Sequence, residues 1–285
     1  MKAMGINSED NKQEQTDQNT NEEVKEEIED SKLEEMQTTR KIKNVRSLVK
    51  ELQNVIIQRY EDKPLLYKGK KFDLRVYMII ICTKPYFVVY NEGYCRISLH
   101  EYNLEDFNTK EGKITHMTNA SVQKKHPDYK EKKEDTIIDM NTLKEYLIDQ
   151  KKIENTQEFD DKVTNKIKEI MRVMFLQVKD KLDRTYGCFE LLGWDFLLDE
   201  NLNPFLIEVN INPALFTDTS IQKKIIPKMI NDTIDLVMKM NKHTFSKLPE
   251  QEFQQVAAEV ANSEEDSKYD FEVIYQEGVE SSPLV

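Results

Sequence analysis

Residues 189–215 have the sequence FELLGWDFLLDENLNPFLIEVNINPAL. Two mainly apolar runs, 189–199 and 204–210, flank the polar segment 200–203, which predicts an antiparallel hairpin with a four-residue loop. In that register Asp195 lies directly opposite Glu208, and Asn210 falls two residues further on, on the same face. Both faces are otherwise apolar. One of them is expected to carry Trp194, Phe196, Leu198, Phe205, Ile207 and Val209.

The facing carboxylates of Asp195 and Glu208 would repel each other on a half-buried sheet. A hard divalent cation would remove the conflict, because Asp, Glu and an amide oxygen suit Mg²⁺ in a site shared with phosphate oxygens. A shared proton would remove it too, as would a Lys or Arg partner from elsewhere in the chain. The spacing by itself leaves these alternatives open.

A second group of charged residues lies in the stretch KKFDLRVYMIII, residues 70–81. Lys71, Asp73 and Arg75 alternate along a predicted strand, so all three project from one face while the residues between them enter the core. Such a row is either a self-compensating surface ladder or, beside a metal–carboxylate site, a row that binds phosphate.

The rest of the chain alternates between strand and helix patterns and predicts an α+β fold, an antiparallel sheet with flanking helices. The expected strands are 55–60, 75–82, 86–90 and 94–99, the last three forming a meander broken at Lys84-Pro85 and at Glu92-Gly93. The expected helices are 141–152, 159–183 and 219–240, with Pro227 as a kink or a start. A loop is expected around 126–135.

Charge divides the 285 residues into three parts. Residues 1–40 hold 12 acidic and 5 basic residues, and residues 244–285 hold 10 and 2, so the net charge of −12 belongs to the ends. Both ends are expected to be disordered, the second one mostly, because acidic polar tracts bury too little apolar surface to offset the entropy of ordering. The folded domain is expected to span residues 41–243.

Composition also excludes some classes of protein. No apolar run is long enough to span a membrane, and the first residues lack the apolar stretch of a secretory signal. Cys82, Cys95 and Cys188 form neither a disulfide framework nor a CxxC metal motif, which is typical of a reduced, cytosolic protein.

Five stretches, taken in order, resemble one known family. VIIQRYEDKPLL, KKFDLRVYMII, GYCRISL, HMTNASVQKK and the hairpin sequence together resemble the ATP-grasp ligase core of the tubulin tyrosine ligase-like family, over about residues 54–240. The resemblance implies the C-terminal lobe of an ATP-grasp fold. It also implies an ATP- and Mg²⁺-dependent ligase that adds an amino acid to a carboxylate of tubulin or another protein through an acyl phosphate.

The resemblance further implies roles for individual residues. Gln58 and Tyr60 match the hinge that meets adenine. Lys71, Asp73 and Thr118 match nucleotide-binding residues, Arg75 matches the arginine near the transferred phosphate, and Arg96 matches an arginine that binds a substrate carboxylate. Asp195, Glu208 and Asn210 match the Mg²⁺ ligands, with Glu208 also counted, like Arg75, as catalytic.

The branch of the family and the completeness of the site are separate expectations. VNINPAL and KPYFVVYNEGYCRISL are most similar to the polyglycylase branch, so glycine is the expected amino acid; a tubulin polyglutamylase and a truncated, inactive microtubule- or partner-binding protein are the alternatives. The lobe that covers the phosphates is expected to be missing, since Gly5 is the only glycine before the hinge. The expected partners are acidic tubulin tails or other acidic acceptors and free glycine or glutamate, not nucleic acid or membrane. The expected location is the cytoplasm and cytoskeleton, in the cilium or axoneme.

Overall fold

A computed structural model of the chain describes residues 58–105, 109–246, 250–261 and 268–279. The chain divides into two compact units, Met1–Tyr60 and Glu61–Val285. Only residues 58–60 of the first unit are described, and they form no regular strand. The predicted strand 55–60 is therefore wrong at its last three residues, and its first three lie outside the described part. All that follows concerns the second unit.

The second unit is built on an antiparallel sheet whose described strands follow the order β4-β3-β2-β5-β6. Two short strands pair outside this path, β1 with β2 and β7 with β3. The strands are β1 (Leu66–Tyr67), β2 (Lys70–Thr83), β3 (Tyr86–Ile97), β4 (Ile137–Ile138), β5 (Glu190–Leu198), β6 (Pro204–Asn210) and β7 (Glu272–Gln276). The predicted antiparallel sheet with flanking helices is confirmed.

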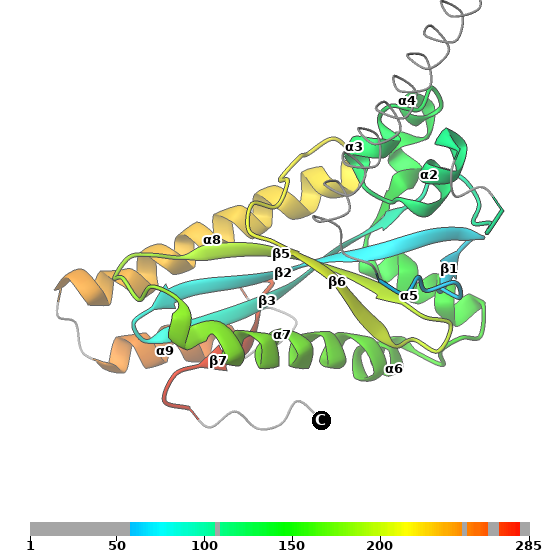
Figure 1. Cartoon of the computed structure of the whole chain (residues 1–285). Coiled ribbons are helices and arrows are strands. Elements are labelled where there is room, and N and C mark those ends of the chain that lie inside the picture. The colour runs from blue at the N-terminus through cyan, green and yellow to red at the C-terminus, as the bar shows by residue number, and fades with distance from the viewer. Residues whose placement is uncertain (1–57, 106–108, 247–249, 262–267, 280–285) are drawn as a thin grey trace, which may run out of the picture. The chain divides into compact units, whose positions relative to one another are not determined.

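Helices cover both faces of the sheet, with α7 and α8 on opposite sides (Figure 1). In chain order they are α2 (Lys110–His116), α3 (Ala120–Gln123), α4 (Tyr129–Lys132), α5 (Met140–Asp149), α6 (Thr156–Phe159), α7 (Asn165–Val178), α8 (Ser220–Ser246) and α9 (Glu250–Ala261). A π-helical turn, Asp160–Thr164, joins α6 to α7. Pro227 lies inside α8 rather than at its start. No helix in the described ranges is long and apolar enough to cross a membrane.

Strand β2 lies at the centre, and beyond Arg75 both of its faces are mainly apolar. Leu74, Val76 and Met78 pack with α5 to α7, whereas Tyr77 and Ile79 pack with α8 and α9. A strand buried on both sides reads as a continuous apolar run rather than an alternation. Burial of these two clusters supplies the main driving force for folding of this unit.

The C-terminal segment is more ordered than its composition predicts. α9 and β7 both lie beyond residue 244, and β7 pairs with β3. Phe253, Tyr269 and Phe271 are buried in the cluster under α8. The prediction of a mostly disordered tail is therefore wrong for 250–261 and 268–279, because a few aromatic side chains anchor an otherwise acidic segment. The predicted loop 126–135 is also partly helical, since it contains α4 and a 3₁₀ turn, Lys133–Thr136.

Strand β3 runs without interruption through Glu92-Gly93, where a turn was predicted. These two residues lie opposite the single residue Val76 of β2, which makes a β-bulge. Gly93 has a φ of +62°, and a Cβ atom there would lie 1.9 Å from the backbone oxygen of Arg75. The glycine therefore permits both a left-handed conformation and a close approach of two backbones.

The bulge at Gly93 predicts a large loss of stability for Gly93→Ala. The change adds backbone strain and a backbone clash, and we expect it to lower the free energy of unfolding by about 3 kcal/mol or more. Gly278→Ala is the matched control, because Gly278 has a φ of +83° but nothing within 4 Å of the added Cβ. It should lose only about 1 kcal/mol. Urea denaturation of both variants measures the difference, and equal losses would contradict the role given to the close approach.

The hairpin of β5 and β6 has the predicted register at Asp195 and Glu208. Asp195 pairs with Glu208, and Gly193 pairs with Asn210. A bulge then shifts the register by one residue, so Phe196 pairs with Leu206. The predicted faces of Phe205 and Ile207 are therefore wrong: both side chains are exposed, and Leu206 packs against the core instead.

Candidate active site

Four charged residues from three neighbouring strands form one ion-pair network on the sheet face that α8 and α9 cover further along. Asp73 on β2 pairs directly across from Arg96 on β3, and Arg75 on β2 pairs directly across from Asp195 on β5. Both pairs are bidentate, with Nη2–Oδ2 distances of 2.9 Å. Arg96 Nη2 also donates to Asp195 Oδ2 at 2.8 Å, which joins the two pairs. Strand register alone thus brings the predicted residues together.

The network is buried and electrically balanced. Asp195 is 1% exposed, Asp73 4% and Arg75 5%. Burial raises the pKa of Asp195, but the hydrogen bond from Arg75 and the charges of Arg96 and Arg75 outweigh burial and hold this pKa below its ordinary value. Burial lowers the pKa of Lys71, which lies on β2 near Asp73, more than the charge of Asp73 raises it. The arginine partners foreseen as one alternative for Asp195 are therefore present.

Thr118 reaches the network from the segment between α2 and α3. Its hydroxyl donates to Asp73 Oδ2, and its side chain is buried. Gln123, which sequence reasoning did not single out, holds this segment: its Nε2 donates to the carbonyls of Thr118 at 2.7 Å and Ile97 at 3.1 Å. The only sequence signal for Gln123 was its place inside the quoted stretch HMTNASVQKK.

Glu208 and Asn210 lie beside the network on β6. Asn210 Nδ2 is 3.2 Å from Glu208 Oε1 and 3.4 Å from Asp195 Oδ2, so the amide links the two carboxylates on one face, as predicted. Glu208 is exposed, and no cation among the described residues pairs with it. One carboxylate of the facing pair is thus compensated by arginines and the other is not.

This donor set fits a magnesium ion. Two carboxylates on one sheet face are hard oxygen ligands, and Glu208 has no competing cation among the residues described. The amide of Asn210 would add a third oxygen by turning its Oδ1, in place of Nδ2, toward the ion. Asp195 would share its oxygens with Arg75 and Arg96. Gln58 and Tyr60 belong to the first unit and are exposed, so their predicted contact with adenine stays a prediction.

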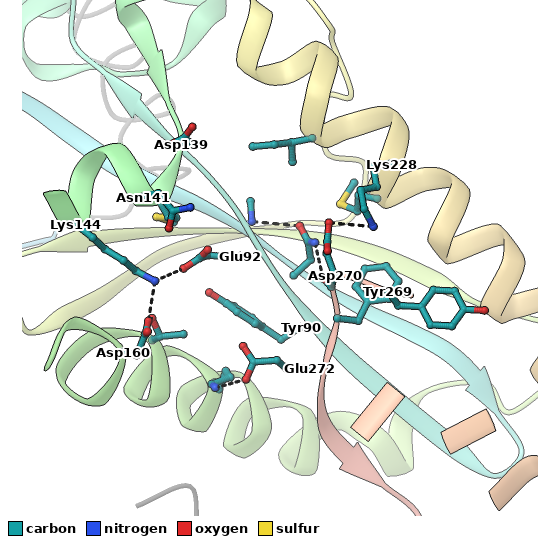
Figure 2. A pocket seen from close by; sticks show the side chains of 18 of the residues that line it. Tyr90, Glu92, Asp139, Asn141, Lys144, Asp160, Lys228, Tyr269, Asp270 and Glu272 are labelled. Carbon is teal, nitrogen blue, oxygen red and sulfur yellow. Dashed lines mark hydrogen bonds and ion pairs between the residues drawn. The ribbon is translucent and has the colours of Figure 1, made fainter. Parts of the chain in front are cut away.

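A separate cavity of about 740 Å³ opens along the edge of β3 that faces away from β2, between β4 and β7 (Figure 2). None of the predicted site residues lines it. Lys144, which lines it, is neutralised by Glu92 and Asp160, as Figure 2 shows. Lys168 is paired with Glu272 of β7 in the same way. These ion pairs connect α5 to β3 and α7 to β7.

Comparison with known proteins agrees with this fold. The profile of the tubulin-tyrosine ligase family matches residues 5–245. The chain belongs to the tubulin-tyrosine ligase family, and the family resemblance seen in the five motifs is confirmed.

Individual relatives support the polyglycylase-like branch. The chain is 39% identical over 186 residues to the protein polyglycylase TTLL10 of Rattus norvegicus, an alignment that covers 64% of this chain and 27% of the rat protein. It is 37% identical to the inactive polyglycylase TTLL10 of Homo sapiens, with the same two shares covered. It is 32% identical to the probable tubulin polyglutamylase TTLL9 of Bos taurus, covering 65% of this chain and 39% of that protein. The chain thus spans between about a quarter and a third of the length of the polyglycylase relatives it matches.

The ion-pair network predicts different stabilities for two isosteric substitutions. Asp195→Asn leaves Arg75 and Arg96 buried with one negative partner fewer, and we expect a loss of about 3–5 kcal/mol in the free energy of unfolding. Glu208→Gln removes an exposed charge without a cationic partner and should change this free energy by less than about 1 kcal/mol. Urea denaturation near neutral pH measures both. A loss from Glu208→Gln as large as that from Asp195→Asn would contradict the assigned charge balance.

At acid pH, the difference in free energy of unfolding between the wild-type protein and Asp195→Asn should become smaller. A carboxyl group whose pKa is lower in the folded protein contributes stability that is fully present above its unfolded pKa of about 4 and disappears as pH falls through the folded pKa. Below about pH 4, wild-type stability should therefore approach that of Asp195→Asn. Urea midpoints from about pH 6 to about pH 3 measure this trend; a constant gap would show that Asp195 keeps its ordinary pKa.

Proposed function

We propose that this chain carries the catalytic face of an ATP- and Mg²⁺-dependent ligase that adds glycine to carboxylates of tubulin or another protein. The observation that carries the proposal is the asymmetry of the facing pair: Asp195 is neutralised by arginines, while Glu208, opposite it, is exposed and has no described cationic partner. An uncompensated carboxylate beside an amide and a second carboxylate is a ready ligand for a hard cation.

Each side of the cluster suits one part of the reaction. Lys71, Asp73 and Thr118 would bind the nucleotide, and Asp195, Glu208 and Asn210 would hold Mg²⁺. The ion, when bound, supplies positive charge to the phosphate oxygens. Arg75 would stabilise the negative charge of the transferred phosphoryl group, a role that depends on fixed orientation. Its bidentate pair with Asp195 already fixes the guanidinium plane.

The reaction joins an acceptor carboxylate to an amine. The carboxylate oxygen takes the γ-phosphoryl group, giving an acyl phosphate and ADP. The amine nitrogen then attacks the acyl carbon, phosphate leaves, and the nitrogen loses a proton to give the amide. Arg96 would bind the carboxylate of the incoming amino acid. Its Nε and Nη2 are engaged by Asp73 and Asp195, while Nη1 makes no hydrogen bond within the described part and remains able to donate.

Glycine is the proposed amino acid because the relatives named polyglycylases are 37–40% identical to this chain. Glutamate is the alternative, since relatives named glutamylases reach 32–33% and a named tubulin glycylase reaches only 29%. A third possibility is a ligase-like protein that binds microtubules or a partner without catalysis. The human relative whose name includes the word inactive supports it. Tubulin as acceptor implies a place on the cytoskeleton, with the cilium as a narrower proposal.

Substitution of Glu208 tests the proposal. Glu208→Gln keeps the shape of the side chain but removes a hard anionic ligand, and we expect amino-acid incorporation to fall about 100-fold or more. Folding should be retained, since Glu208 is exposed. Glu200→Gln, in the exposed loop of the same hairpin, is the matched control and should leave incorporation unchanged.

The assay measures radiolabelled glycine, and separately glutamate, on microtubules with ATP and Mg²⁺. It is run with the 285-residue chain and with a fusion in which the preceding lobe of a close relative is added, because the phosphates need positive charge on both sides. Incorporation of glutamate but not glycine would replace the proposed amino acid. Equal activity of Glu208→Gln and the wild type would overturn the assigned site, and inactivity of the fusion with both amino acids would favour the non-catalytic alternative.

A further inference from the structure

Two histidines and an aspartate meet outside the proposed active site. His100 lies three residues beyond the end of β3, and His126 and Asp128 lie in the turn between α3 and α4. One possible ligand atom from each residue lies within 4.8 Å of the other two. The imidazole rings meet edge to face, with centroids 4.7 Å apart and planes at 81°. Two imidazoles and a carboxylate from two separate non-helical, non-strand segments thus lie close together.

One of these nitrogen atoms is left without a partner. His100 Nε2 is shielded from solvent, yet no group in the described part of the chain forms a hydrogen bond with it. A buried polar atom without a partner lowers stability, and native structures contain few of them. A metal ion is one partner that an imidazole nitrogen accepts.

The carboxylate of Asp128 has one oxygen engaged and one available. Lys132 Nζ donates to Oδ2 at 3.0 Å, while Oδ1 lies 3.9 Å from His126 Nδ1. That nitrogen accepts a 3.2 Å hydrogen bond from the backbone N–H of Asp128, which is the interaction that ligation through Nδ1 would replace. Lys132 would then be the outer partner that orients the ligating carboxylate.

We propose that His100, His126 and Asp128 bind one Zn²⁺ ion. Zinc takes imidazole nitrogen and carboxylate oxygen together, and sites with three protein ligands complete their coordination with water. The two imidazoles favour zinc over Mg²⁺ or Ca²⁺, which prefer oxygen ligands only. Edge-to-face ring packing and an i,i+4 ion pair account for two of the contacts but leave His100 Nε2 unexplained.

A zinc ion here would be structural rather than catalytic. It would fasten the end of β3 to the turn between α3 and α4. The same segment holds Gln123 and, just before α3, Thr118, whose hydroxyl contacts Asp73. The ion would therefore hold in place the segment from which Thr118 contacts the candidate active site. Binding of the ion does not depend on the proposed ligase activity.

Metal binding is tested with the full chain, freed of any polyhistidine tag and treated with a chelator. Cys188→Ser serves as the background, because Cys188 is exposed and could bind zinc by itself. We expect calorimetry to give one Zn²⁺ per chain. The melting temperature should rise by about 5–10 °C when free Zn²⁺ is near 100 times the dissociation constant. Substituting cobalt for zinc should give the visible absorption of a low-coordinate site.

Variants assign the ligands. His126→Ala should weaken zinc binding by more than the roughly 10- to 100-fold that loss of a supporting partner causes. If His126→Ala fails to fold, Asp128→Asn replaces it, because this change keeps the shape of the side chain. His116→Ala is the matched control: His116 also packs edge-on against a ring, that of Tyr102 at 5.5 Å, but it belongs to no such cluster among the residues that the structure describes. It should still bind one equivalent. Failure of the background protein to retain zinc would overturn the proposal, as would one retained equivalent in both His126→Ala and Asp128→Asn.

Discussion

The register of β2 against its two neighbours is the constraint on which the candidate site depends. It places Asp73 opposite Arg96 and Arg75 opposite Asp195, so two bidentate ion pairs form without any loop having to position them. A shift of β2 by one residue would turn Asp73 and Arg75 toward the apolar layer under α7 and leave Arg96 and Asp195 without them, because successive side chains of a strand alternate between faces. The apolar residues on both faces of β2 therefore fix the ion pairs indirectly, by fixing the register.

The glycine bulge in β3 is part of the same constraint. Without the extra residue at Glu92-Gly93, Arg96 could not face Asp73 while Tyr90 and Val89 keep their places further along the strand. The β5–β6 bulge serves a similar purpose, since it leaves Asp195 opposite Glu208 while Leu206 enters the core. Both irregularities lie next to the site, where a strand has to change which residues face the core.

The charged residues of the candidate site differ in whether their charge is neutralised within the protein, and this difference distinguishes those with a structural role from those able to bind a ligand. One group of charges is internally balanced: it consists of Asp73, Asp195, Arg75 and Arg96, and removal of any one of them would destabilise the fold. Glu208 is outside this balance because β6 is at the edge of the described sheet and its side chain reaches solvent. The buried network can thus hold an orientation, while the edge strand offers the carboxylate that a ligand would use.

The sequence by itself determined the hairpin, the pairing of Asp195 with Glu208, the antiparallel sheet with its helices, and the family. These depend on local periodicity, turn composition and motif order, which a single chain displays directly. Tertiary structure alone decided which cations answer Asp195, because Arg75 and Arg96 come from strands about a hundred residues away in sequence. It also decided that Gly93 makes a bulge and not a turn, and that a few aromatic residues anchor α9 and β7 despite their acidic surroundings. Both outcomes depend on contacts with segments distant in the chain, and such contacts cannot be inferred from local composition and spacing.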